Sequence, residues 1–453
     1  MRPALLTAVV VLSCASPGAT SQSPSTTSSA APSFAPTESG TPSPQSTAVG
    51  SADLADAGVL FFFSSSKAGW FRFDGASRRL TEIGYASVAV QAETSQVIYL
   101  AGPQGSTSLL RWDGTLDSPY DCGGGGFTSF NVAGACASFG SHTGPGPLPI
   151  TVFRTPPVAV RLPGDARPRV VLPEDWGAVA ALWSPDSARL AVTRVEPPYP
   201  TADDQPFQMS MWIVQADGAA RLLYRPAPGR GVPLQWSSDG KYLTGFEVRP
   251  GDSVLRLLLL EVASGRVTDL GNAPALPGSI AWSGDGLLSF VRGSGSVSWR
   301  DKEVVVREVD GSEHVLTPPG SVGFAPVWDS ARGRLAWIAG PSGDGTGYLE
   351  GTGVGDRVVV VSDLAGTTQE IRCPGRVVEG VRWSRNGDAL LLLCRRPSAT
   401  SDVFELWLHR LNSRAGPATV FIVAGLGWDD YFDRQTGVAR SLATSVAWSR
   451  AVP

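Results

Sequence analysis

The residues best suited to bind a ligand gather in a short segment near the C-terminus, Trp428-Asp429-Asp430-Tyr431. Exposed tryptophan and tyrosine side chains supply contact area at low entropic cost, and carboxylates add selectivity. Residues of the same kinds occur in other long loops: Tyr199, Asp203, Asp204, Tyr348 and Glu350. We interpret these nine as candidate binding residues. The alternative is that Trp428 caps a strand and the aspartates are solvated loop residues.

Motifs for catalysis or cofactor binding are absent from the sequence. There is no Gly-x-Ser-x-Gly elbow, no P-loop and no dinucleotide-binding fingerprint. The acidic pairs lie outside any Asp-x-Asp-x-Asp-Gly loop, and no Cys-x-x-Cys spacing exists. We therefore expect no metal, no cofactor and no catalytic residue. Of the histidines, His142 has no identifiable partner, and His314 and His409 fall within strands where we expect them to face outward.

The N-terminus reads as a targeting segment followed by a linker. Residues 1–14 predict a signal peptide, because Arg2 precedes an apolar stretch far shorter than the ~20 residues that span a bilayer. Cys14 ends a sequence that resembles a bacterial lipoprotein signal, in which that cysteine is lipidated. Residues 15–52 are almost entirely Ser, Thr, Pro, Ala and Gly, which predicts a disordered tether. We expect an extracytoplasmic protein anchored to the bacterial cell membrane; plain secretion is the alternative.

Four cysteines follow Cys14, an even number that suits disulfides in an exported chain. Proximity in sequence favours the pairs Cys122–Cys136 and Cys373–Cys394. Each pair would join the end of one repeat unit to the start of the next. The alternative is that Cys394, inside an apolar run, is a buried thiol.

One phrase recurs along the chain: a tryptophan, in most copies a serine, a turn with aspartate or asparagine and glycine, and then an apolar run. Successive copies are 46 to 55 residues apart and begin at Trp183, Trp236, Trp282, Trp328 and Trp383. Asp and Gly suit a tight hairpin, which needs positive φ and a side-chain cap. A period near 50 residues with strands inside each unit is typical of a β-propeller.

The repeat predicts an all-β fold, a β-propeller of eight four-stranded blades within residues 53–453. Weaker copies surround Val90 and Phe130, and a last copy begins near the C-terminus with Trp448. The first segments after the tether supply only three strands. We therefore expect the C-terminal strand to complete the N-terminal blade, which removes exposed sheet edges. Seven blades is the alternative, because the pattern around Phe130 is weak.

The phrases resemble the repeats of TolB-like propellers, which read approximately Trp-Ser-Pro-Asp-Gly before an apolar strand, as in Trp183-Ser184-Pro185-Asp186. The resemblance covers about residues 56–449. It implies a propeller scaffold and a tendency to bind proteins or peptides. The chain shows no match to the extra N-terminal domain of TolB or to the hydrolase domain of prolyl oligopeptidases, two other features of this family.

The loops of a propeller alternate between its two faces, and the long insertions of this chain fall on the face opposite the tight turns, the usual layout of a binding surface. We therefore expect a non-catalytic scaffold that binds a protein, a peptide or an envelope polymer and acts as a monomer. The net charge of −4 gives no basic surface for nucleic acid. The alternative is a propeller hydrolase or lyase that acts on carbohydrate or peptide at the mouth of the axial channel.

Overall fold

The computed structural model consists of strands and connecting turns in the part of the chain that it describes, and no helix there could cross a membrane. The described residues are 58–64, 69–75, 77, 79–84, 88–91, 97–101, 107–111, 113–117, 121–123, 127–130, 135–139, 155–198, 208–226, 229–248, 255–273, 278–293, 301–329, 333–342, 357–384, 386–396, 403–412, 418–422, 432–433, 438–439 and 446–449.

Within these residues the strands form eight four-stranded antiparallel sheets and one hairpin. Sheets 1 to 4 comprise, in spatial order, β34 (Val446–Ser449), β1 (Val59–Ser64), β2 (Gly69–Asp74) and β3 (Arg79–Gly84); β4 (Val88–Gln91), β5 (Val97–Ala101), β6 (Thr107–Arg111) and β7 (Leu116–Asp117); β8 (Phe127–Phe130), β9 (Cys136–Phe139), β10 (Val158–Arg161) and β11 (Arg169–Leu172); and β12 (Ala178–Trp183), β13 (Arg189–Val195), β14 (Met209–Gln215) and β15 (Ala220–Tyr224).

Sheets 5 to 8 follow the same order, and the hairpin comes last. They comprise β16 (Arg230–Trp236), β17 (Tyr242–Val248), β18 (Leu255–Glu261) and β19 (Val267–Ala273); β20 (Ile280–Trp282), β21 (Leu288–Gly293), β22 (Lys302–Arg307) and β23 (Glu313–Val315); β24 (Ser321–Trp328), β25 (Leu335–Pro341), β26 (Val358–Ser362) and β27 (Thr368–Ile371); β28 (Val377–Trp383), β29 (Ala389–Arg396), β30 (Val403–Arg410) and β31 (Ala418–Ile422); and the hairpin β32 (Phe432–Asp433) with β33 (Val438–Ala439).

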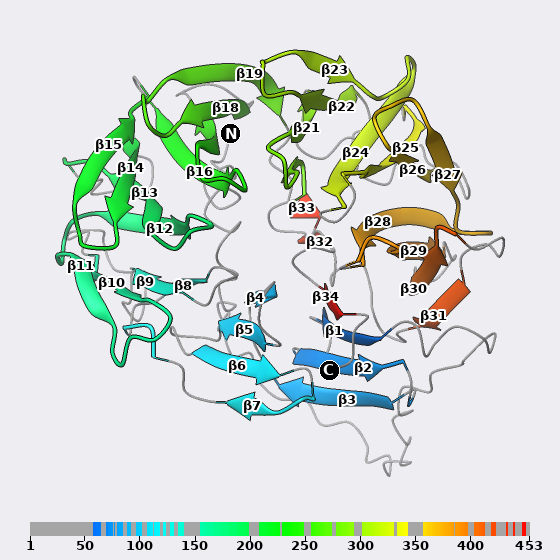
Figure 1. The fold of residues 1–453 in the computed structure, drawn as a ribbon, viewed down its shortest axis with the longest axis horizontal. Coiled ribbons are helices and arrows are strands. Elements are labelled where there is room, and N and C mark those ends of the chain that lie inside the picture. Colours follow the sequence, from blue (N-terminus) through cyan, green and yellow to red (C-terminus); the bar gives the residue numbers. More distant parts are fainter. Residues whose placement is uncertain are drawn as a thin grey trace, which may run out of the picture.

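The sheets are arranged around a common centre (Figure 1). In each of sheets 2 to 8 the first strand lies nearest the centre and the fourth lies at the rim, so the gap between neighbouring sheets widens outward. This radial arrangement of twisted antiparallel sheets is that of a β-propeller, the all-β architecture that the repeat predicts.

The tight turn of the repeated phrase is held by its own side chains. The Ser184 hydroxyl donates to Asp186 (2.5 Å) and accepts from the N–H of Arg189 (3.0 Å), and Ser237 donates likewise to Asp239 (2.7 Å). Gly240 closes its turn at a φ of 68°, which a side chain would strain. We call this end of each sheet the turn end, and the opposite end, where the second and third strands are connected, the loop end.

Three of the repeat tryptophans, Trp236, Trp328 and Trp383, link successive sheets, as expected from their position at the end of the inner strand; the indole N–H groups of Trp183 and Trp282 have no acceptor among the described residues. The indole N–H of Trp236 donates to the carbonyl of Leu182 (3.0 Å), and that of Trp383 donates to the carbonyl of Val327 (3.0 Å). In both cases the acceptor immediately precedes the tryptophan of the preceding sheet. Leucine occupies the paired position on the second strand of five sheets, where it is buried against the preceding sheet: Leu190, Leu243, Leu288, Leu335 and Leu390.

Two distant parts of the sequence meet in sheet 1, where β34 pairs with β1 and Trp448 lies opposite Leu60. The Trp448 side chain is buried. Between sheet 8 and β34 the chain forms the hairpin β32–β33, which projects onto the centre of the ring in Figure 1. The sequence analysis treated this stretch as a loop connection and missed the hairpin, whose two strands carry no periodic pattern because each has only two residues.

Candidate functional site

The candidate binding residues and the lipidation cysteine lie outside the described residues, and their roles stay predictions. They are Tyr199, Asp203, Asp204, Tyr348, Glu350, Trp428, Asp429, Asp430, Tyr431 and Cys14. His142 also lies outside the described part. The structure does describe the strands that bracket three of the loops: β13 and β14, β25 and β26, and β31 and β32.

The four remaining cysteines are joined as Cys122–Cys136 and Cys373–Cys394. Each bond connects the segment that enters a sheet with that sheet's second strand, β9 in sheet 3 and β29 in sheet 8. All four residues are buried. The bonds therefore restrain the entry of the chain into sheets 3 and 8.

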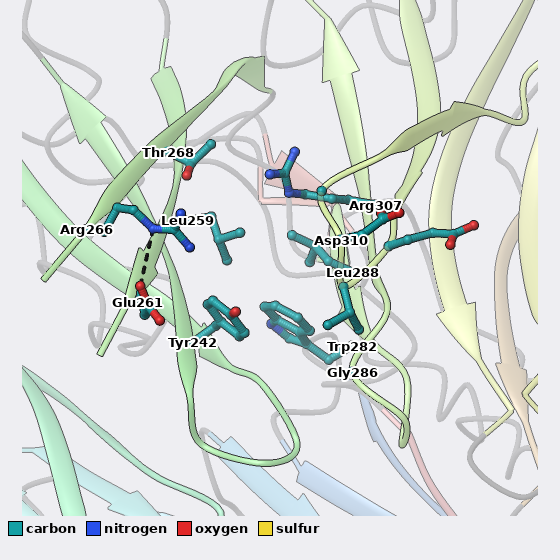
Figure 2. A pocket seen from close by; sticks show the side chains of 13 residues that line it. Tyr242, Leu259, Glu261, Arg266, Thr268, Trp282, Gly286, Leu288, Arg307 and Asp310 are labelled. Carbon is teal, nitrogen blue, oxygen red and sulfur yellow. Dashed lines mark ion pairs between the residues drawn. The ribbon is translucent and has the colours of Figure 1, made fainter. Parts of the chain in front are cut away.

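A small cleft opens at the turn end between sheets 5 and 6 (Figure 2). Tyr242 of β17 and Trp282 of β20 stack with ring centroids 6.2 Å apart and planes 14° apart. Leu259 and Leu288 line the cleft beside this pair. Its volume of about 110 Å³ is below the ~300 Å³ at which small-molecule sites begin. The cleft therefore has room for a single side chain of a partner.

Charged groups at the cleft are already engaged. Arg266 pairs with Glu261 (3.2 Å), and Arg307 pairs with Glu313 (2.9 Å). Hydrogen bonds from the N–H and hydroxyl of Ser312 lower the pKa of Asp310. The charged side chains at the cleft are therefore already bonded to neighbours within their own sheets.

The loop end of sheet 4 carries an aromatic and cationic cluster. The Arg194 guanidinium lies 4.7 Å from the ring centroid of Trp176 and 5.4 Å from that of Trp212. The two indoles meet edge to face, with centroids 5.4 Å apart. Arg194 also donates to the Trp176 carbonyl (2.9 Å), which fixes the guanidinium in place. All three side chains are half-buried, so part of this arrangement faces solvent.

Glu196 connects the sheet 4 cluster with the exposed Arg225. It accepts from Ser210 and from Arg225 (3.0 Å), and its carboxylate lies 3.8 Å from Arg194. Partial burial opposes the charge of Glu196, but the hydrogen bonds from Ser210 and Arg225 outweigh it and lower the pKa. The connection between β13 and β14, which contains Tyr199, Asp203 and Asp204, begins and ends beside this cluster.

The loop end of sheet 8 is instead a buried ionic cluster. Glu379 of β28 is bracketed by Arg357, which precedes β26 of sheet 7, and by Arg395 of β29 (2.8 Å). Glu405 of β30 accepts from Arg376 (3.1 Å) and from the indole of Trp407 (2.9 Å). The side chains of Glu379 and Glu405 are 3% and 1% exposed. The pair of Arg357 with Glu379 joins sheets 7 and 8.

Acidic residues are rare on the inner strands that the structure describes: Glu379 is the one carboxylate in β4, β8, β12, β16, β20, β24, β28 and β34. Among the described residues no three His, Cys, Asp or Glu side chains gather as metal ligands would. His314 is exposed and lies 3.0 Å from Glu308. His409 was expected to face outward, and this expectation is wrong: it is 5% exposed, because neighbouring sheets cover both faces of β30.

The sequence analysis missed the sheet 4 cluster. Trp176 and Trp212 lie outside the repeated phrase, and Arg194 ends the apolar run after Trp183. The available signals were two tryptophans outside the repeat and an arginine that directly follows the apolar segment of a strand.

No protein-family model and no curated protein matches the chain. Solved structures do match it. Dipeptidyl peptidase 4 from Porphyromonas gingivalis is 12% identical with a TM-score of 0.54, and the match covers 87% of this chain and 62% of that protein. The dihydro-heme d1 dehydrogenase NirN in complex with DHE is 15% identical with a TM-score of 0.50, covering 84% and 76%.

A TolB protein from Agrobacterium tumefaciens is 12% identical with a TM-score of 0.36, and the match covers 86% of this chain and 97% of that one. At these identities the likeness concerns the fold alone. The chain is thus a β-propeller in which the tight turns are closed by their own side chains and the half-buried tryptophans and arginine of sheet 4 lie at its loop end.

Proposed function

We propose that the protein is an exported binding scaffold that recognises a protein, a peptide or an envelope polymer at the loop ends of its sheets. The observation that carries this proposal is the half-buried cluster of Trp176, Arg194 and Trp212, which keeps part of its surface in contact with solvent. Aromatic and arginine side chains dominate the energetics of protein recognition, because they bury large areas at small entropic cost. Arg225 adds a second, exposed guanidinium beside them.

The scaffold in this proposal is a single closed ring of eight blades that acts as a monomer. Support comes from the eight four-stranded sheets of the described residues and from the pairing of β34 with β1. Closure of this kind leaves no unpaired inner edge and gives the loops a rigid base.

Export and anchoring complete the proposal. Lipidation of Cys14 would hold the protein at the outer side of the cell membrane, with residues 15–52 as a tether. Disulfides persist in oxidising compartments, so the Cys122–Cys136 and Cys373–Cys394 bonds support an extracytoplasmic location.

The geometry gives less support to a hydrolase or lyase at the axial channel. Such an enzyme needs carboxylates or histidines that converge at the channel mouth. The described inner strands contain one carboxylate, that of Glu379, and it is already paired with Arg357 and Arg395.

Site-directed photo-crosslinking in intact cells tests the proposed binding surface. A benzophenone side chain replaces Arg225 at the loop end of sheet 4 or, as the control, Val170 on the outer strand of sheet 3, which is 62% exposed. We expect a discrete crosslinked product from position 225 and none from position 170. Equal products from both positions, or none from position 225, would contradict a binding site at this loop end.

A further inference from the structure

An arginine of the chain covers the repeat tryptophan of the next sheet in two of the gaps between sheets. Between sheets 4 and 5, the Arg189 guanidinium lies 5.4 Å from the ring centroid of Trp236 and donates to the carbonyl of the turn residue Gly240 (3.1 Å). Arg334 makes both contacts between sheets 7 and 8, where its guanidinium lies 4.8 Å from the centroid of Trp383 and donates to the turn glycine. The tryptophan and the turn glycine of a sheet thus form a seat for a guanidinium group.

Tyr242 takes the place of this arginine between sheets 5 and 6. Like Arg189 and Arg334, it directly precedes the leucine that pairs with the repeat tryptophan. Trp282 and Gly286, the tryptophan and the turn glycine of sheet 6, both line the cleft that Figure 2 shows. The near-parallel rings of Tyr242 and Trp282, with centroids 6.2 Å apart, overlap only in part, and both side chains are half-buried. Part of this aromatic surface therefore stays open to an occupant.

The space beside the turn glycine is also open in this gap. A Cβ atom added to Gly240 would lie 2.9 Å from the Arg189 guanidinium. One added to Gly286 would meet nothing among the described residues nearer than Val309, 4.0 Å away, apart from its chain neighbours. No described residue donates a hydrogen bond to the Gly286 carbonyl, the counterpart of the acceptor in the other two gaps. Between sheets 5 and 6 the seat therefore has its ring and its acceptor, but a tyrosine where the arginine stands elsewhere.

Charge at the cleft favours a cation as the occupant. The lining residues include three carboxylates and two guanidinium groups, and both guanidinium groups are already paired within their own sheets. Glu308 and Asp310 form no ion pair with an arginine or lysine among the described residues. Glu308 lies 3.0 Å from His314, and Asp310 accepts from Ser312. Because a carboxylate accepts several hydrogen bonds, both groups can receive an incoming cationic donor.

We propose that the cleft between sheets 5 and 6 binds an arginine side chain of a partner protein. The guanidinium packs against the Tyr242 and Trp282 rings and donates to the Gly286 carbonyl. The carboxylates of Glu308 and Asp310 balance its charge. A volume of about 110 Å³ admits one such side chain. A guanidinium suits this setting better than an ammonium, because it is planar, less strongly hydrated and rich in donors. The cleft lies at the turn end, so this site is separate from the loop-end surface proposed above.

Ligand-observed NMR titration of the full-length protein tests this assignment with three probes. They are an acetylated and amidated pentapeptide with a central arginine between alanines, and the same peptide with lysine or with citrulline at its centre. Lysine keeps the charge without the planar fork, and citrulline keeps the shape without the charge. We expect the arginine peptide to bind about tenfold more tightly than the lysine peptide, and the citrulline peptide not to bind. No binding of the arginine peptide would overturn the site, and equal affinity of either other peptide would overturn the assignment to a guanidinium.

Substitutions at two cleft residues locate the binding. Tyr242→Arg places an arginine of the chain in the seat and should weaken binding of the arginine peptide about tenfold or more. Val309→Lys adds a positive charge at a cleft residue that is 69% exposed, where folding tolerates the change, and should weaken binding about fivefold. The matched controls Val170→Arg and Val170→Lys, on the outer strand of sheet 3, should leave the affinity unchanged. Unchanged affinity in Val309→Lys, or in a folded Tyr242→Arg protein, would overturn the placement at this cleft.

Discussion

The loop ends of sheets 4 and 8 occupy the same place in the repeat but are stabilised by different chemistry. On the second strand, Arg194 follows Leu190 of sheet 4 by the same number of residues as Cys394 follows Leu390 of sheet 8. The third strand has Trp212 and Trp407 at matching positions. Arg194 lies between two indoles with its side chain 22% exposed, whereas Cys394 is buried in a disulfide.

This difference separates a surface suited to recognition from a structural joint. Sheet 8 buries its carboxylates with arginines that come partly from sheet 7, which makes the joint rigid and inaccessible. Sheet 4 leaves its aromatic rings and Arg225 at the surface, beside the connection between β13 and β14. One repeat position can therefore serve either role, depending on whether its charges are buried with partners or left in contact with water.

The largest difference in stability between the two loop ends should appear when the central carboxylate of each is removed. Glu379→Ala leaves Arg357 and Arg395 buried without their shared counter-ion and should lower the free energy of unfolding by ~3–5 kcal/mol. Glu196→Ala removes the ion pair with the exposed Arg225, the 3.8 Å contact with Arg194 and the hydrogen bond from Ser210, and should cost less, about 1–2 kcal/mol. Urea unfolding of both variants measures the difference. Equal losses would show that the two loop ends do not differ in this way.

The next largest difference between sheets 8 and 4 should come from the disulfide of sheet 8, Cys373–Cys394. Replacing Cys373 and Cys394 together by alanine opens a loop with a sequence separation of 21 and should cost about 3 kcal/mol. In the native protein the amides of β29 should exchange hydrogen more slowly than those of β13, and the double variant should remove much of that difference. The matched control replaces Cys122 and Cys136, which lie in sheet 3. If the control slows or speeds β29 exchange as much as the test variant, the bond is not a local restraint of sheet 8.

The parts of the fold that the sequence predicts are those encoded by neighbouring residues. The turns of the repeat are closed by side chains two to five residues away, as at Ser184 and Asp186, so the phrase itself contains the structural information. In sheets 5, 7 and 8 the tryptophan of the phrase then connects the inner strand to the preceding sheet. The hairpin β32–β33 has no such signal.

The candidate clusters could not be predicted in the same way, because strand register brings their members together. Trp176, Arg194 and Trp212 are separated by up to 36 residues, and only the pairing of β12, β13 and β14 makes them neighbours. The burial of His409 escaped prediction for a related reason. Alternation along a strand distinguishes a buried from a solvated face, but in a propeller blade the neighbouring sheets cover both faces.

The smallest contrast is in pH dependence. Burial lowers the pKa of His409 below its ordinary value of 6.5, and no described residue bonds to its ring nitrogens. As the pH falls, the unfolded chain therefore takes up the proton at a higher pH than the folded protein does. The stability that the neutral, buried His409 provides is fully present above pH ~6.5 and is lost as the pH falls below that value. His409→Leu should remove that loss.

Glu196 has a lowered pKa, so the stability that its carboxylate gives sheet 4 persists until the pH falls below its ordinary value of 4.5. Urea unfolding between pH 7.5 and ~4.5 should show a free energy of unfolding that decreases with falling pH in the native protein. This decrease should become smaller in His409→Leu and remain in Glu196→Ala. An equal decrease in the native protein and in His409→Leu would mean that acid destabilises the protein at another place than sheet 8.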